Sequence, residues 1–419
     1  MNIVALSAFK SRNYKLFFVG QTISLLGTWM QKTAVSWVIY SLTHSKFMLG
    51  VSIFATLFPS AILTPLGGVV SDRYNRYKVL LITQILSMVQ ALALTLVVFF
   101  DNYAVWEIIS LSVFLGLINA FDVPARQSLV YELVDDKKNL PNALALNSSM
   151  VNLSKLIGPA IAGIAIERFG EVACFAANTT SFIAVISSLL LIKLPRFEAV
   201  KHTKNILGEL AEGLTYIRQT PEIRYIITML ALVSLLLLPF TSLMPIYAKD
   251  IFRGTASTFG LLDSAIGCGA LIGAIFLATL KPGTNLSRIL AINTFVFAAG
   301  LMLFSYTTLY PLALAFVAIG AFGMMSQTTI SNTLIQTLVA PTMRGRVISI
   351  FVMAYSGGMP IGSLLVSYIS QHIGVQATVF VQGILALLIG IMHVRYLKRR
   401  RASEPVPVSS KVLEEIPQV

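Results

Sequence analysis

Long apolar runs alternate with short polar connections along almost the whole chain. Each run has roughly the 20 residues that a helix needs to cross a bilayer core of about 30 Å. The runs are too long and too continuously apolar for the alternating strands of a membrane barrel. The pattern therefore predicts an all-α integral membrane protein with twelve transmembrane helices, at approximately 15–40, 47–70, 79–100, 105–123, 142–166, 172–192, 224–247, 257–280, 287–306, 309–332, 346–369 and 375–396.

The longest polar connection separates six predicted spans from six. Its middle, at 207–217, has the pattern of a short amphipathic helix at the membrane surface. We therefore expect an N-terminal six-helix bundle, a linker, a C-terminal six-helix bundle and a cytoplasmic tail, at 1–192, 193–223, 224–397 and 398–419.

The two sets of six spans carry related segments. The fifth span contains LIGPAIAG at 156–163, and its counterpart six spans later contains GGMPIG at 357–362. Each follows a similar element, QSLVYELV at 127–134 or NTLIQTLV at 332–339. Two related halves of six spans are typical of secondary transporters.

Charge sets the orientation. Only 12% of residues are charged, against about 25% in soluble domains. With a cytoplasmic N-terminus, 25 of the 31 Lys and Arg residues lie inside, and this asymmetry predicts that both termini are cytoplasmic. It also explains the net charge of +13 without nucleic-acid binding. The start of the chain lacks the short apolar region of a cleavable signal peptide. The four basic residues on the outside are Lys46, Arg168, Lys249 and Arg253.

Candidate chemistry for an enzyme or a metal site is sparse. Cys174 and Cys268 fall in or beside apolar runs, and the four histidines are scattered. The chain has no Gly-x-x-x-x-Gly-Lys-Ser/Thr loop for ATP. We therefore expect no metal, no cofactor and no enzymatic activity.

The connection GGVVSDRYNRYK, at 67–78, is similar to the signature Gly-x-x-x-Asp-Arg-x-Gly-Arg-Arg/Lys of the major facilitator superfamily. Asn75 replaces the second glycine. Three further stretches, GQTISLLGTWMQKTAVSWVIYSLTHS, AFDVPARQSLVYELV and NALALNSSMVNLSKLIGPAIAG, resemble the branch that contains the enterobactin exporter and the macrolide-type efflux pumps. The resemblance covers nearly the whole chain and implies the major facilitator fold. The matching signature positions are Gly68, Asp72, Arg73, Arg76 and Lys78.

The resemblance implies that this loop is a gate. Gly68 is expected to allow close helix packing. Asp72 is expected to meet the positive N-terminus of span 346–369 in the outward-open state. Arg73 and Lys78 are expected to face lipid headgroups. A loop that only enforces topology is the alternative, and it accounts for the cations but not for the acid.

The same loop is expected to contact the fourth span. The resemblance implies that Arg76 pairs with an acid at the cytoplasmic end of span 105–123, and Asp122 is the candidate. Arg126, one helical turn further on, is the other available partner of Asp122. If Arg76 and Asp122 interact, their substitutions should have less than additive effects.

Span 142–166 is interrupted by Gly158 and Pro159. Proline removes a backbone hydrogen bond and bends the helix, and Gly163 permits close packing. The segment partly resembles the antiporter motif Gly-Pro-x-x-Gly-Gly, with Ala162 in the first of the two final positions. The resemblance favours proton-driven export over import, whereas an ordinary proline kink explains the same residues.

Ionisable residues within spans are costly and are often functional. Lys32, Lys155 and Asp263 lie on spans that border the central cavity of this fold. An acid that meets a cation in one conformation and loses it in another would exchange protons. Asp263 is therefore the candidate coupling residue, followed by the two lysines. Because Asp263 lies only about two helical turns from the outer boundary, solvation in the outer vestibule is the alternative. Three polar residues are as readily explained by interhelical hydrogen bonds as by substrate contact, namely Gln31, Asn119 and Asn147.

Together these features predict a secondary active transporter, a proton-coupled exporter of a small amphiphilic molecule such as a drug or siderophore, which works by alternating access. Its expected partners are this substrate, protons and the lipid bilayer, and we expect a monomer. The alternatives are an importer or uniporter on the same fold and a non-transporting membrane sensor.

Overall fold

The computed structural model describes residues 4–101, 103–194, 206–281 and 283–403. These residues form helices and short connections without a strand. The N-terminal half consists of α1 (Arg12–Thr43), α2 (Lys46–Arg73), α3 (Arg76–Phe99), α4 (Val105–Leu133), α5 (Leu140–Phe169) and α6 (Glu171–Leu190), with short 3-10 segments at Val4–Lys10 and Lys137–Asn139. The C-terminal half consists of α8 (Pro221–Leu232), α10 (Ala256–Ala278), α11 (Leu286–Ser305), α12 (Tyr310–Leu338), α13 (Arg344–Ile373) and α14 (Val375–Ser403).

Eleven helical segments of the described residues are long and apolar enough to cross a membrane. α1 is not among them, although its 32 residues pack along α5 and α6. Gln21, Gln31 and Lys32 make α1 more polar than its neighbours. The twelve predicted spans thus correspond to eleven clear ones and α1, and the predicted fold class is confirmed.

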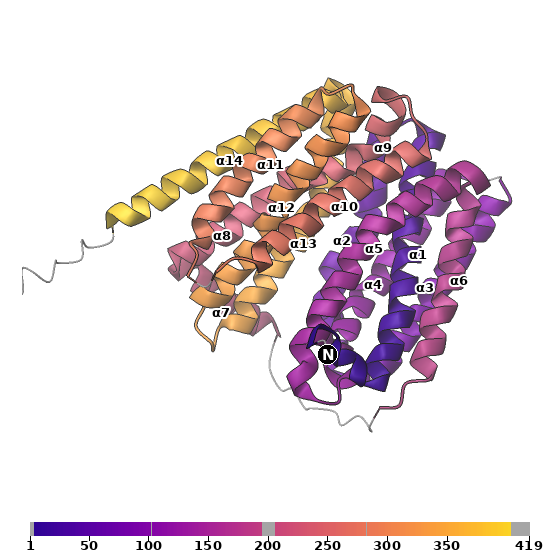
Figure 1. The fold of residues 1–419 in the computed structure, drawn as a ribbon, viewed down its shortest axis with the longest axis horizontal. Helices are drawn as coiled ribbons and strands as arrows, with labels where there is room; N and C mark the ends of the chain where they lie inside the picture. Colours follow the sequence, from indigo (N-terminus) through magenta and orange to yellow (C-terminus); the bar gives the residue numbers. More distant parts are fainter. Residues whose placement is uncertain (1–3, 102, 195–205, 282, 404–419) are drawn as a thin grey trace, which may run out of the picture.

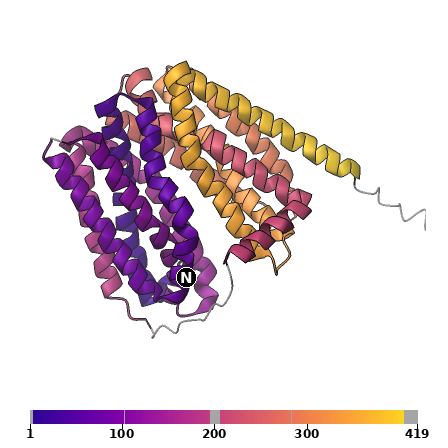
Figure 2. The same ribbon diagram turned by 180° about the vertical axis from the view of Figure 1, so that it is seen from behind.

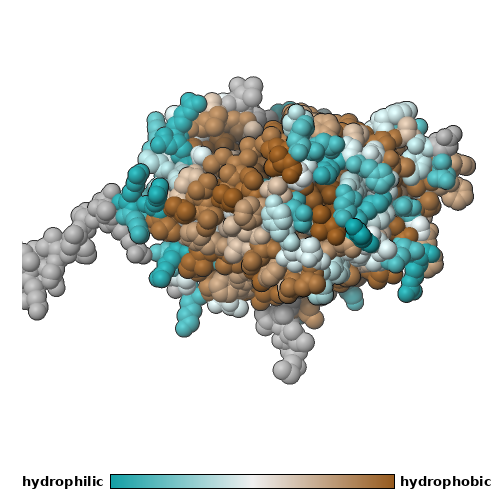
Figure 3. Space-filling model, turned by 90° about the horizontal axis from the view of Figure 1, so that it is seen from above, coloured by the Kyte–Doolittle hydropathy of each residue, from teal (hydrophilic) through white to brown (hydrophobic). Residues whose placement is uncertain are grey.

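Large hydrophobic side chains are exposed over much of the helical surface. Ile62, Ile82 and Phe99 are each more than half exposed, at 56%, 56% and 64%. From above, hydrophobic residues cover much of the visible face, and hydrophilic residues gather in separate groups (Figure 3). Soluble monomers rarely expose apolar patches of this extent. The exposed helix faces therefore contact lipid, and the protein is an integral membrane protein.

The seventh crossing is a broken helix, where the sequence predicted a continuous one at 224–247. Pro239 and Pro245 lack the N–H donor of a regular helix. Irregular backbone is tolerated at membrane depth where protein surrounds it, and most side chains of this stretch are buried. After α8 the chain forms a π-helical turn, a 3-10 segment, the single turn α9 and a second π-helical turn, at Val233–Leu237, Leu238–Leu243, Met244–Ile246 and Tyr247–Ile251.

The segment that joins the halves contains α7 (Ile206–Gln219), which packs against α13. Glu212 of α7 forms an ion pair with Arg346, with Oε2 and Nη1 2.9 Å apart. Residues 195–205 of the predicted linker and 404–419 of the predicted tail lie outside the described residues, and 398–403 continue α14.

The crossing helices of each half run between two ends of that half. We call the end where α1 begins and α6 finishes the linker end, and the opposite end the far end. The two halves lie together at the far end and diverge towards the linker end in both ribbon views (Figures 1 and 2). The hydrogen bonds that join described residues of the two halves are all at the far end.

Glycines permit backbone contact between the halves. A Cβ added to Gly163 of α5 would lie 2.7 Å from a backbone oxygen of α10, and Gly260 of α10 touches the carbonyl oxygen of Pro159. On the other side of the molecule, a Cβ on Gly50 of α2 would lie 2.7 Å from the carbonyl oxygen of Ser363 in α13. Such an approach needs residues without a side chain. Two helix pairs, α5 with α10 and α2 with α13, therefore form the contact.

Candidate functional site

A charged residue lies on each side of the contact between α5 and α10. Gly260, Asp263 and Gly267 are three and four residues apart, so they share one face of α10. The two glycines touch the backbone of α5. Asp263 is therefore on the side that faces α5, and it interacts electrostatically with Lys155 of that helix.

Lys32 of α1 completes this cluster, which we call the charged triad. Trp29 lies one turn earlier and packs on Gly158 of α5, where an added Cβ would be 2.5 Å from the Trp29 Cβ. The Lys32 Nζ is 4.5 Å from the centroid of the Trp29 ring, a cation–π contact. Lys32 also interacts electrostatically with Lys155 and Asp263. Lys32 is exposed, and the other two residues are half-buried.

The predicted polar contacts divide into two groups. Gln31 is 3% exposed and is used in packing. Its amide nitrogen donates to Oε1 of Gln90 on α3 at 3.0 Å, and its oxygen accepts from Nδ2 of Asn178 on α6 at 2.8 Å. These bonds make Gln31 an interhelical residue rather than a substrate contact. Asn119 and Asn147 are half-buried on α4 and α5, and their roles stay predictions.

The loop after α2 forms a different ion pair from the predicted one. Arg76 binds Glu132, with Nη1 and Oε1 2.9 Å apart. Asp122 instead pairs with Arg126 at 3.2 Å and accepts hydrogen bonds from two side chains of α3. The expected Arg76–Asp122 pair is wrong because α4 ends at Leu133, ten residues beyond the predicted 123. That is roughly 15 Å of helix, so the acid at the linker end of α4 is Glu132.

The glycines before this loop also depart from expectation. Gly67 touches the backbone of α4, whereas a Cβ on Gly68 would meet nothing within 4 Å. The close approach predicted for Gly68 is therefore made by Gly67 in this conformation. Arg73 and Lys78 are exposed, and their predicted contact with lipid headgroups stays a prediction. Asp72 belongs to α2, but its side chain lies outside the described residues.

The three residues of the predicted motif in α5 all lie at helix contacts. Gly158 packs on Trp29 of the same half, and the carbonyl oxygen of Pro159 touches Gly260 of the other half. Gly163 meets the start of α10. The motif thus packs α5 against both halves at once, and its link to export stays a prediction.

The far end is closed by side chains that the sequence did not single out. Tyr40 donates a hydrogen bond to Asp250. The Lys249 Nζ donates to the hydroxyl of Ser41 at 3.2 Å and lies 5.6 Å from the centroid of the Trp37 ring. We call these bonds the far-end seal. It also includes bonds of Lys46 with Ser370 and Gln371, and of Glu167 with Thr255 and Ser257.

The model of the transmembrane secretion effector family, a branch of the major facilitator superfamily, matches residues 3–416. The chain belongs to this family. The prediction of a major facilitator protein, and of a transporter rather than an enzyme, is confirmed by this membership. In the part of the chain that the structure describes, no group of three or more His, Cys, Asp and Glu side chains is placed to hold a metal.

Relatives of this major facilitator protein cover nearly its whole length. It is 26% identical over 379 residues to the staphyloferrin A transporter of Staphylococcus aureus, which covers 90% of this chain and 94% of that protein. It is 24% identical to macrolide efflux protein A of Streptococcus pyogenes, over 91% of this chain and 96% of that protein. It is also 24% identical to the enterobactin exporter of Shigella flexneri, over 94% of both chains. The predicted branch is therefore confirmed.

The fold is shared with solved transporters. A crystal structure of a POT family transporter in complex with a thioalcohol-conjugated peptide superposes with a TM-score of 0.74. The superposition covers 93% of this chain and 96% of the POT family chain, at 13% sequence identity. At that identity the likeness concerns the fold alone.

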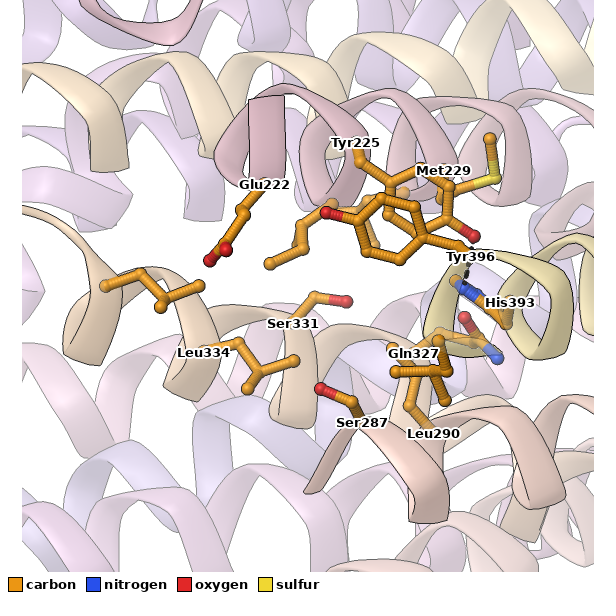
Figure 4. Close-up of a pocket in the computed structure, with 14 residues that line it drawn as sticks. Glu222, Tyr225, Met229, Ser287, Leu290, Gln327, Ser331, Leu334, His393 and Tyr396 are labelled. Carbon is orange, nitrogen blue, oxygen red and sulfur yellow. Dashed lines mark hydrogen bonds between the residues drawn. The ribbon is translucent and has the colours of Figure 1, made fainter. Parts of the chain in front are cut away.

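Major facilitator transporters bind substrate between their repeats near the bilayer midplane, and one cavity of this protein lies elsewhere. It is inside the C-terminal half at the linker end, where Tyr225 and His393 form a hydrogen bond of 2.8 Å and Gln327 and Ser331 line the wall (Figure 4). Its volume of about 60 Å³ is far below the roughly 300–1,000 Å³ of small-molecule sites. The charged triad, on the contact between the halves, is the better candidate for the transport site.

Proposed function

We propose that this member of the transmembrane secretion effector family is a secondary active exporter of a small amphiphilic molecule, working by alternating access. The charged triad carries the proposal. Lys32 and Lys155 belong to the N-terminal half and Asp263 to the C-terminal half, so rocking of the halves acts directly on the site. The names of the macrolide efflux and enterobactin export relatives support the outward direction.

The linker end is proposed to be cytoplasmic, in a bacterial inner membrane. The basic residues support this orientation, since 25 of 31 lie on that side. The far-end seal then closes the outer side, and the structure corresponds to the inward-facing state. In the outward-facing state the seal would separate, and Asp72 would meet the start of α13 instead.

Asp263 is proposed to couple transport to protons. It interacts electrostatically with Lys32 and Lys155, and the ion pairs between described residues do not include it. Separation of the halves at the far end would change the distance from the carboxylate to both cations. A change in neighbouring charge changes the proton affinity of an acid, as coupling to a pH gradient requires.

Flux into proteoliposomes with an imposed pH gradient tests this function. Siderophores, macrolides and lipophilic cations are the substrates to screen. We expect Asp263→Asn to abolish flux driven by the pH gradient and to retain substrate binding. Asp101→Asn is the matched control, because Asp101 is an exposed turn residue with a φ of 50° that Asn also adopts.

Two results would contradict the proposal in different ways. Equal pH-dependent flux by the parent and Asp263→Asn would exclude Asp263 as the coupling residue. A folded parent protein that transports none of the screened compounds would contradict the export function itself.

A further inference from the structure

The charged triad is not electrically balanced. Lys32 and Lys155 are both cations, and Asp263 is the acid with which both interact. With all three ionised, the triad carries one net positive charge. Uncompensated charge among transmembrane helices is costly, so a ligand with a negative charge would be stabilised there.

The position of Lys155 is fixed by the crossing of α5 and α10. A Cβ on Gly267 of α10 would lie 3.1 Å from the carbonyl oxygen of Lys155. Lys155 therefore sits on the contact between the halves, one helical turn of α10 away from Asp263. A ligand bound at this lysine touches both halves, as a transported molecule must.

Lys32 lies at the exposed surface of its half, whereas its chain neighbours are packed inside it. Gln31 and Thr33 are 3% and 2% exposed, and Lys32 is exposed. The Lys32 Nζ lies 4.5 Å from the centroid of the Trp29 ring. The lysine thus keeps donors for a ligand, and the half-buried indole beside it offers an apolar surface.

We infer that the transported molecule is an amphiphilic organic anion, with its negative group between Lys32 and Lys155 and its apolar or aromatic body against Trp29. Ammonium groups donate strong charge-assisted hydrogen bonds to carboxylate and similar oxygens. A cationic substrate would have only Asp263 as its partner and would add to the net positive charge. The inference rests on the proposed transport function, but it does not depend on proton coupling.

Binding of two dyes with the same three-ring core separates the two charge classes. Carboxyfluorescein is an anion and rhodamine 123 is a cation, and fluorescence anisotropy measures the affinity of each for the purified full-length protein in detergent. We expect the parent to prefer carboxyfluorescein. Lys32→Gln and Lys155→Gln should each weaken its binding by roughly tenfold or more, the factor for loss of one charge-assisted hydrogen bond.

Control variants keep this result specific. Lys15→Gln removes an exposed lysine of the same helix, near the linker end, and should leave the affinity unchanged. Lys32→Arg retains the charge and should retain most of the affinity. Circular dichroism and gel filtration establish that each variant is folded.

Preference of the folded parent for rhodamine 123 would overturn the inference. So would failure of carboxyfluorescein to bind, or equal binding by the parent and both lysine variants. Because binding is measured without a gradient, a parent protein that binds carboxyfluorescein but transports none of the screened compounds would contradict the proposed function, and it would leave only the anion-binding site standing.

Discussion

Gly163→Ala tests whether the contact between α5 and α10 keeps the far-end seal closed. A Cβ at this position would lie 2.7 Å from the carbonyl oxygen of Ala256 and 2.8 Å from the Cα of Ser257. Ordinary contact begins at 3.4 Å, so the two backbones must move apart by about 0.7 Å (3.4 − 2.7). Overpacking of this kind costs roughly 1–3 kcal/mol. Parting of the halves removes the contact, so the cost falls on the sealed state and favours the open one by roughly 5- to 150-fold.

A buried reporter in the seal measures this shift. Ser370 is 0% exposed, and its hydroxyl has no partner among the described residues, so Ser370→Cys is a small change. In a chain without Cys174 and Cys268, a membrane-impermeant maleimide then reports opening of the far end. Gly163→Ala should raise the rate at which the maleimide labels this cysteine by the same roughly 5- to 150-fold. Gly357→Ala is the control, because a Cβ there meets nothing within 4 Å, and an unchanged rate in folded Gly163→Ala would refute the reasoning.

Three further predictions concern residues on which sequence and structure differ or which await a test. Arg76→Ala and Glu132→Ala should be less than additive in thermal unfolding, by roughly 0.5 kcal/mol because both side chains are partly exposed. Arg76→Ala and Asp122→Ala should have additive effects on stability. A less than additive effect for this pair, with additive effects for Arg76→Ala and Glu132→Ala, would instead support the Arg76–Asp122 pair expected from the sequence. Gln31→Ala should cost roughly 1–3 kcal/mol of stability, because the buried Oε1 of Gln90 and Nδ2 of Asn178 lose this partner. Substrate affinity should be unchanged, and a loss of affinity at full stability would show that Gln31 contacts the substrate. Asp72→Asn should slow flux with normal expression, by roughly 1–3 kcal/mol of conformational coupling, and normal flux would exclude a gating role.

The crossing helices could be predicted because the bilayer sets a minimum apolar length. The residues at which these helices terminate on the linker side could not be predicted, since a helix can continue into water once its polar residues no longer face lipid. α4 continues in this way to Leu133, and the error at its end led directly to Asp122 instead of Glu132. The broken seventh crossing was also missed, because its apolar composition is that of a regular helix.

The candidate site could be predicted in part for a similar reason. Lys32, Lys155 and Asp263 stand out within apolar runs, since charge is rare there. The far-end seal does not stand out, because Tyr40 and Asp250 are separated by 210 residues and both lie near predicted span ends, where polar residues are ordinary. Which of them meet depends on how the two halves sit together, and no local pattern encodes that placement.

The hydrogen bonds of Gln31 bear on how the protein enters the membrane. α1 leaves the ribosome before the other crossing helices that the structure describes. It carries Lys32, and a lysine at a helix centre costs roughly 2.5–3.5 kcal/mol during insertion. The Asn178 partner of Gln31 is synthesised 147 residues later, on α6. The polar partners of Gln31 are therefore complete only when the sixth helix emerges. Biogenesis of the N-terminal half should depend on α1 being held at the translocon, or by a membrane chaperone, until α3 and α6 arrive.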